Sequence, residues 1–133
     1  MEYFVYGTLI DPDSASSVLD AFTYRGPATL VGCHRVEGRY PTLAPGGEVA
    51  GRLLATDETA ALDRYEGVSS GLYVRVSVPV DDADEPVETY VGDPDRLGAP
   101  ATWPGDGLFE RRVRAYLHDH DVFVRREGGF TPG

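Results

Sequence analysis

Hydrophobic residues near the amino terminus form a short apolar run, which is followed by a weaker helical pattern. The run covers Tyr3 to Tyr6 and stops at Gly7, as expected for a buried first strand. After Asp11-Pro12, either Asp13 or Ser14 is placed to cap a helix. Its partial apolar stripe consists of Val18, Leu19 and Phe22. This part of the chain predicts a strand followed by a helix.

Longer extended segments come next, separated by residues that favour turns. Residues 26–39 alternate in the manner of a strand, and residues 49–55 resume that pattern after Pro45-Gly46-Gly47. Because proline and glycine together favour a turn, we predict a hairpin that turns at residues 45–47. A second hairpin pattern follows, with strands at 72–80 and 87–91 around the acidic turn 81–85.

Two segments carry the apolar spacing of helices. The first opens with Thr56-Asp57-Glu58, continues to Tyr65 and is followed by Gly67, which is typical of a helix C-cap. The second covers residues 108–120 and has four apolar side chains at helical intervals, Phe109, Val113, Tyr116 and Leu117. Residues 92–107 predict a long irregular segment, and residues 122–124 form either a late strand or an extended tail.

The order of these elements predicts the fold class and the domain organisation. Hairpin-like strand pairs beside a few helices favour an α+β fold, with a small, mixed and largely antiparallel β-barrel flanked by helices. A chain of 133 residues has room for one hydrophobic core, so we expect residues 1–133 to form a single domain. The last helix and the apolar residues after it form a C-terminal helical extension at about 107–127.

The charge balance argues against two classes of partner. Lys and Arg together number 12 and Asp and Glu 22, and the formal net charge of −10 repels both nucleic acid and an anionic membrane. Every basic residue is an arginine. Together with the many aspartates, this composition is halophile-like, although a GC-rich genome also favours arginine.

Two features bear on the compartment. Cys33 is the single cysteine, which excludes an internal disulfide and suits a reducing environment. The segment from Met1 to Tyr6 has too few apolar residues for a signal peptide or a membrane span. We therefore expect a cytoplasmic protein.

The loop Tyr6-Gly7-Thr8-Leu9 leaves the end of the predicted first strand. Glycine lets the backbone turn sharply and approach a ligand without a Cβ atom in the way. Consecutive N–H groups at such a strand end can converge on an anion such as a carboxylate. Four-residue turns after strands are common, so the loop alone does not distinguish a binding site from an ordinary turn.

Glu66 stands at the end of the predicted helix, immediately before Gly67. A carboxylate at this position faces the negative end of the helix dipole, and burial in an apolar pocket would raise its pKa further. A raised pKa suits proton transfer at neutral pH. A solvated glutamate at a frayed helix end is the alternative explanation.

Four sequence elements, taken together, resemble the gamma-glutamylcyclotransferase-like family. They are Tyr6-Gly7-Thr8-Leu9, Gly38-Arg39-Tyr40-Pro41, Leu62-Asp63-Arg64-Tyr65-Glu66-Gly67 and Leu72-Tyr73-Val74-Arg75. Their order and spacing match the family over about residues 2 to 92. Known members release 5-oxoproline from gamma-glutamyl amino acids or gamma-glutamylamines. The resemblance therefore implies a small-molecule substrate with a gamma-glutamyl group, no cofactor and no metal site.

The resemblance also implies roles for individual residues. The backbone of Tyr6, Gly7, Thr8 and Leu9 would bind the alpha-carboxylate end of the substrate. Glu66 would take a proton from the alpha-amine, which attacks its own gamma-carbonyl, and would pass a proton to the leaving amine. Three further residues would bind substrate or support the pocket, Tyr73, Arg75 and Tyr90. A core position for the Tyr90 ring is an equally good explanation of its place in a strand.

The carboxyl-terminal part departs from the family, whose members commonly finish soon after a Gly-Asp-Trp-like element. Residues 102–106, Thr-Trp-Pro-Gly-Asp, resemble that element only loosely. The extension at 107–127 would cover one end of the barrel, narrow the pocket or form a homodimer contact. Two functions also stay open: a gamma-glutamyl cyclotransferase with Glu66 as general acid and base, or a non-catalytic module that binds a small metabolite.

Overall fold

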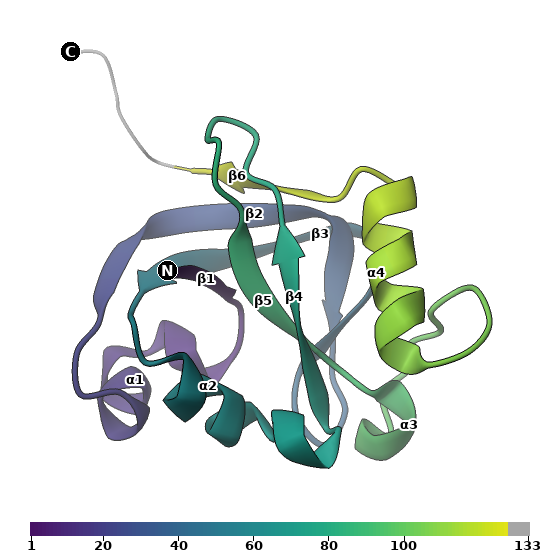
Figure 1. Ribbon diagram of the computed structural model, residues 1–133, viewed down its shortest axis with the longest axis horizontal. Coiled ribbons are helices and arrows are strands. Elements are labelled where there is room, and N and C mark those ends of the chain that lie inside the picture. Colours follow the sequence, from purple (N-terminus) through teal and green to yellow (C-terminus); the bar gives the residue numbers. More distant parts are fainter. Residues whose placement is uncertain (128–133) are drawn as a thin grey trace.

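The computed structural model describes residues 1–127, which form one six-stranded sheet with helices around it (Figure 1). The strands are β1 (Glu2–Val5), β2 (Thr23–Val36), β3 (Thr42–Ala55), β4 (Tyr73–Val78), β5 (Val87–Gly92) and β6 (Phe123–Arg126). The α-helices are α1 (Pro12–Val18), α2 (Thr59–Glu66), α3 (Pro94–Leu97) and α4 (Phe109–Asp119). Two short 3-10 turns follow β1 and α2, η1 (Thr8–Ile10) and η2 (Val68–Ser70).

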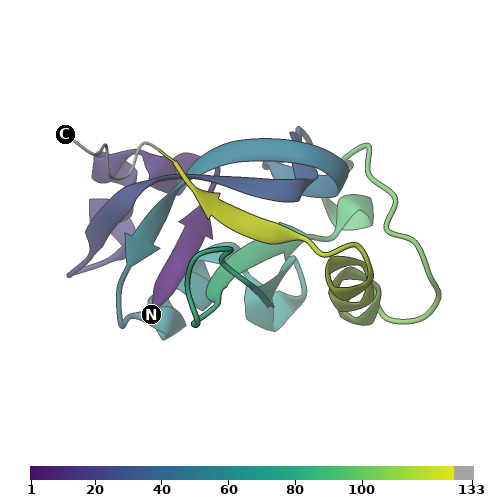
Figure 2. The ribbon, with the colours of Figure 1, turned by 90° about the horizontal axis from the view of Figure 1, so that it is seen from above.

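The sheet is curled and largely antiparallel. Its strand order is β4-β5-β1-β3-β2-β6, and β1 and β5 run parallel where Tyr3 pairs with Glu88. The long strands β2 and β3 arch over the molecule, with β6 along the outer side of β2 (Figure 2). A bridge between Val80 and Val124 brings the two ends of the sheet together. The predicted α+β class, with its mixed and mainly antiparallel barrel-like sheet, is confirmed as a half-barrel.

Irregular pairing between β2 and β3 produces the curl. The register shifts between Tyr24 and Gly26 and again between Val31 and Cys33. Gly26 and Gly32 both have a φ of 109°, a conformation that side chains rarely adopt. Such bulges bend a strand and increase its twist, so the two long strands wrap round the core instead of forming a flat ribbon.

The predicted turn at residues 45–47 is wrong. These residues lie inside β3, and Pro45 pairs with Cys33 of β2 at the second bulge. The chain reverses instead at residues 37–41, between the end of β2 and the start of β3. Gly46 and Gly47 have positive φ values, so the glycines accommodate a bulge opposite β2 and not the hairpin turn.

β1 is buried on both of its faces, which explains its uninterrupted apolar run. Tyr3 and Val5 pack with Leu62 of α2 on the side covered by α1 and α2. Phe4 and Tyr6 point to the opposite side and pack into the larger core. Because successive side chains of a strand alternate between faces, only a strand with cover on both sides has this pattern.

The helices agree with the sequence in part. Gly67 closes α2 in the left-handed conformation, at a φ of 69°, as predicted. The cap of α1 is Asp11, which accepts a hydrogen bond from the Ser14 amide at 3.0 Å, so the predicted cap at Asp13 or Ser14 is wrong. The segment 92–107 is not wholly irregular, because it contains α3.

The carboxyl-terminal segment is part of the packed structure. Helix α4 lies where the sequence predicts a helix, and its Val113 and Leu117 belong to the larger core. Trp103 is buried and packs edge-on against Tyr116 of α4, with ring centroids 5.4 Å apart. Of the two alternatives for residues 122–124, the strand is correct, because β6 pairs with β2.

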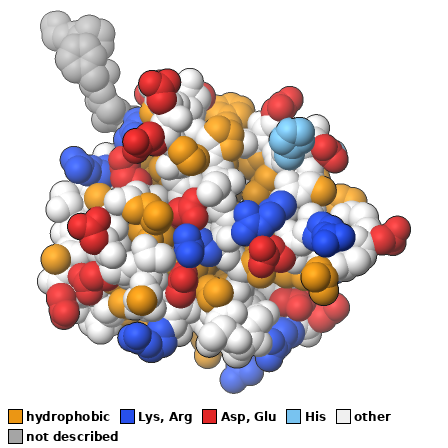
Figure 3. All heavy atoms as spheres, viewed as in Figure 1, with side chains coloured by type: hydrophobic (Ala, Val, Ile, Leu, Met, Phe, Trp, Pro, Cys, Tyr) orange, Lys and Arg blue, Asp and Glu red, His pale blue; other side chains and the backbone are white. Residues whose placement is uncertain are grey.

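The surface carries charges of both signs. On the face seen in Figure 1, acidic and basic side chains are interspersed and not gathered by sign (Figure 3). Within residues 1–127, none of the helices has the length and apolar character needed to span a membrane.

Candidate active site

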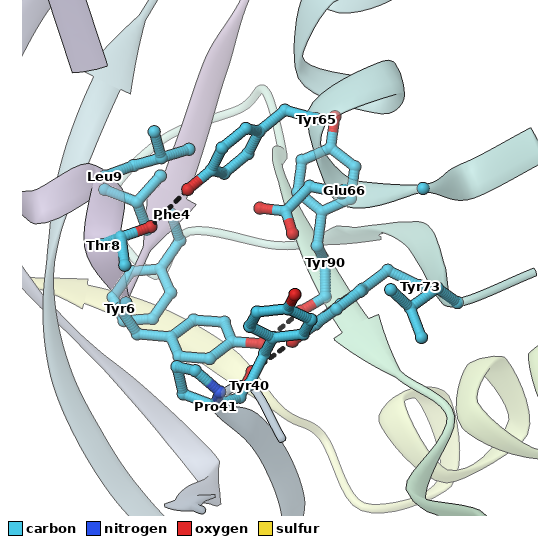
Figure 4. Close-up of a pocket in the computed structure, with 14 residues that line it drawn as sticks. Phe4, Tyr6, Thr8, Leu9, Tyr40, Pro41, Tyr65, Glu66, Tyr73 and Tyr90 are labelled. Atoms are coloured by element: carbon cyan, nitrogen blue, oxygen red, sulfur yellow. Dashed lines mark hydrogen bonds between the residues drawn. The ribbon is translucent and has the colours of Figure 1, made fainter. Parts of the chain in front are cut away.

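A pocket of about 300 Å³ opens at the end of β1, between η1 and the end of α2 (Figure 4). This volume is at the lower end of the range usual for small-molecule sites, about 300–1,000 Å³. Its walls are mainly apolar and aromatic, and Glu66 is the charged residue among the described residues that line it. Elsewhere in residues 1–127, no three His, Cys, Asp or Glu side chains are grouped so that they could hold a metal ion.

The loop after β1 forms one wall of this pocket, and Tyr6, Gly7, Thr8 and Leu9 all line it. The first hydrogen bond of η1 runs from the Ile10 amide to the Gly7 carbonyl, at 3.2 Å. The N–H groups of Gly7, Thr8 and Leu9 precede that bond and are not used by the turn. A Cβ atom on Gly7 would lie 3.3 Å from Cγ of Pro41, so glycine keeps this part of the pocket open.

Glu66 lies opposite this loop. It is the last residue of α2, and its carboxylate points into the pocket towards Thr8 and Leu9 (Figure 4). Removal from water raises the pKa of Glu66 to about 7, because burial penalises the charged form. Both protonation states are therefore populated near neutral pH. Such a group can accept a proton and return it.

Two tyrosines close the pocket around Glu66 and use their hydroxyl groups to bind backbone. The Tyr6 hydroxyl donates to the Tyr90 carbonyl at 2.6 Å, and the Tyr73 hydroxyl donates to the Pro41 carbonyl. Burial, with Glu66 nearby, raises the pKa of both phenols, so Tyr6 and Tyr73 stay neutral. Their rings present mainly carbon to the pocket.

Tyr90 lines the pocket and is also part of the core. Its hydroxyl donates to Oδ1 of Asp63 at 2.7 Å, and the same oxygen accepts from Nε of Arg75 at 3.0 Å. Nη1 of Arg75 also donates to Oε1 of Glu88 at 2.9 Å. These bonds join α2 to β4 and β5 directly behind the pocket.

One expectation about the site requires correction. Arg75 does not line the pocket; its guanidinium lies between the carboxylates of Asp63 and Glu88. On β4 it points to the same side as Tyr73, but Asp63 holds it against α2. Arg75 reaches the pocket only through Asp63 and Tyr90. None of residues 107–127 lines the pocket, so the extension does not narrow it.

Sequence reasoning missed two residues at the pocket mouth. Tyr40 comes from the turn between β2 and β3, and Tyr65 precedes Glu66 on α2. The hydroxyl groups of Tyr65 and Thr8 are hydrogen-bonded at 2.7 Å. Both tyrosines lie inside the motifs quoted above. The signal available in the sequence was that Tyr40 directly precedes Pro41 and Tyr65 directly precedes Glu66.

A family model that matches most of the chain identifies the family of this protein. The family model described as "Gamma-glutamyl cyclotransferase, AIG2-like" matches residues 3–122. The chain belongs to this family. The match extends through α4 and therefore beyond the residues that carry the sequence motifs.

Similar proteins in Arabidopsis thaliana support this family assignment. Protein AIG2 C is 33% identical over 97 residues, which are 66% of this chain and 59% of the relative. This family member thus spans less than two thirds of that relative's length. AIG2-like protein D is 36% identical over 131 residues, covering 86% of this chain and 82% of the relative. A solved gamma-glutamyl cyclotransferase shares the fold, with a TM-score of 0.61 at 16% identity over 89% of this chain and 98% of that one.

Proposed function

We propose that this family member is a gamma-glutamyl cyclotransferase, an enzyme that releases 5-oxoproline from a gamma-glutamylamine or gamma-glutamyl peptide. The observation that carries the proposal is the position of Glu66, whose carboxylate faces the loop Tyr6–Leu9 across the pocket. Its pKa of about 7 suits a group that moves protons in both directions. Membership of the family supports the same reaction.

In the proposed reaction the loop binds and orients the substrate. The N–H groups of Gly7, Thr8 and Leu9 hold the alpha-carboxylate, which needs donors that the apolar walls do not supply. The substrate is then folded back so that its alpha-nitrogen lies against its own gamma-carbonyl. Because both reacting groups belong to one molecule, orientation supplies a large part of the rate.

Glu66 moves the protons of the same reaction. Its carboxylate takes a proton from the alpha-ammonium group, and the free amine attacks the gamma-carbonyl carbon to form the ring C–N bond. Glu66, now protonated, gives that proton to the leaving nitrogen, and the original gamma-amide C–N bond breaks. The attacking nitrogen loses its second proton to the departing amine, so the products are 5-oxoproline and the ammonium form of the amine, and Glu66 ends as it began.

Release of 5-oxoproline tests the proposal. The protein is incubated with a panel of gamma-glutamyl amides, each also supplied with an N-acetylated alpha-amine, and products are measured by mass spectrometry. We expect 5-oxoproline and free amine from the unblocked amides and neither product from the acetylated ones. Binding of the amides without any 5-oxoproline would contradict the proposal and favour a non-catalytic module that binds a small metabolite.

A further inference from the structure

Two exposed aromatic side chains flank the mouth of the pocket. Tyr40 is 49% exposed and Tyr65 is 46% exposed, although both line the pocket. They come from different elements, and Figure 4 shows them on opposite sides of the opening. Single exposed rings are normal on a protein surface, but rings gathered at one opening point to a ligand.

The polar atoms near this mouth are largely turned towards the protein. The Tyr65 hydroxyl is bonded to Thr8, and the Tyr73 hydroxyl to the Pro41 carbonyl. Leu72 and Pro41 add further apolar surface to the pocket lining. A ligand in the mouth therefore meets ring faces and aliphatic carbon.

The charges around the mouth favour an uncharged group. An anionic group would approach the Glu66 carboxylate, and the residues that line the pocket include no Arg, Lys or His. A cationic group would meet Arg39, whose guanidinium carbon already lies 5.7 Å from the centroid of the Tyr40 ring. A charged group of either sign would therefore be repelled by one of the two charged residues near the opening.

We propose that Tyr40 and Tyr65 form a leaving-group subsite that selects amines bearing an uncharged aromatic ring. This inference rests on the proposed function, because the gamma-glutamyl end occupies the inner pocket between Glu66 and the loop. The leaving amine then extends outwards between the two exposed rings. Aromatic pairs in offset or edge-on contact gain attraction beyond the area that they bury.

The test compares kcat/KM for three substrates: gamma-glutamyl benzylamide, gamma-glutamyl methylamide and the cationic gamma-glutamyl 2-aminoethylamide. For the wild type we expect the benzylamide to exceed the other two by about 10-fold or more, the size of one or two aromatic contacts. Tyr40→Ala and Tyr65→Ala should each reduce that ratio several-fold. Tyr40→Phe and Tyr65→Phe keep the ring and should preserve it.

Leu108→Ala is the matched control, because Leu108 is 73% exposed and does not line the pocket. This variant should keep the wild-type ratio. Equal kcat/KM for the benzylamide and the methylamide, or a preference that survives both alanine substitutions, would overturn the leaving-group subsite alone. Absence of 5-oxoproline from all three amides would overturn the proposed function and the subsite with it.

Discussion

The hydroxyl groups of Thr8 and Tyr65 lie 2.7 Å apart and connect the loop after β1 to the last turn of α2. Thr8 stands in the middle of the loop that would bind the substrate, and Tyr65 is the neighbour of Glu66. This bond therefore joins the two walls of the pocket directly. Removing either hydroxyl group by substitution tests whether this contact matters for catalysis.

We predict that Thr8→Val and Tyr65→Phe act through the same hydrogen bond. Each substitution removes one hydroxyl and keeps the shape of the side chain, so each should lower kcat/KM by about 3- to 10-fold. In a double-mutant cycle, the double variant should lose little more than either single variant. Losses that multiply would show that the two hydroxyls act independently.

Catalysis should depend on pH through Glu66. A general base must be ionised, so kcat/KM should rise with pH through a pKa of about 7, the raised value for this carboxyl. A pH–rate profile measured between pH 5 and 9 checks this. The midpoint of the rising part of this profile should stay at the same pH when the substrate carries a less basic alpha-amine. A midpoint near the ordinary glutamate value would contradict the raised pKa of Glu66.

Stability should depend on pH in the opposite sense. The pKa of Glu66 rises from 4.5 to about 7 on folding, so the native state binds more protons between these values. The stability that the protonated carboxyl contributes is fully present below pH 4.5 and is lost as the pH rises through 7. Urea denaturation should therefore show Glu66→Gln to be more stable than the wild type at pH 8 by ~2 kcal/mol. The difference should shrink at pH 4.5, and an equal difference at both pH values would contradict the burial of the carboxylate.

Arg75 should matter for stability and, through Tyr90, for the pocket. Arg75→Ala leaves Asp63 and Glu88 without their shared partner, in a region where their side chains are only 27% and 13% exposed. We expect a loss of ~1–3 kcal/mol in the free energy of unfolding and a lower kcat. Arg125→Ala is the control, since its ion pair with Glu127 is exposed and screened by solvent and should contribute much less to stability. Equal losses in the two variants would contradict the role of the Asp63–Arg75–Glu88 group.

Much of the fold could be predicted because local signals agree with the tertiary structure. The left-handed glycine at Gly67 and the helical spacing after Leu108 depend on nearby residues alone. The turn at residues 45–47 could not be predicted, because a proline–glycine run has the same local preference in a turn and in a bulge. Pairing with Cys33, a residue of the partner strand, decides between them.

The candidate site could likewise be predicted from the sequence only in part. The loop Tyr6–Leu9 and Glu66 lie within motifs whose resemblance to the family implies that they meet in one site. The positions of Tyr40 and Tyr65 at the mouth depend on how far β2 and β3 curl, which no single segment encodes. For Arg75, strand alternation indicates the side on which it lies but not that Asp63 of α2 binds it there.

One measurement tests the central role of Glu66 most directly. It is the initial rate of 5-oxoproline release from one gamma-glutamyl amide at saturating concentration, compared between the wild type and Glu66→Gln. The glutamine keeps the size of the side chain and removes its ability to take up a proton. We predict that kcat falls by about 100- to 10,000-fold while KM changes little. A variant that turns over at a rate near that of the wild type would contradict Glu66 as the group that moves the protons.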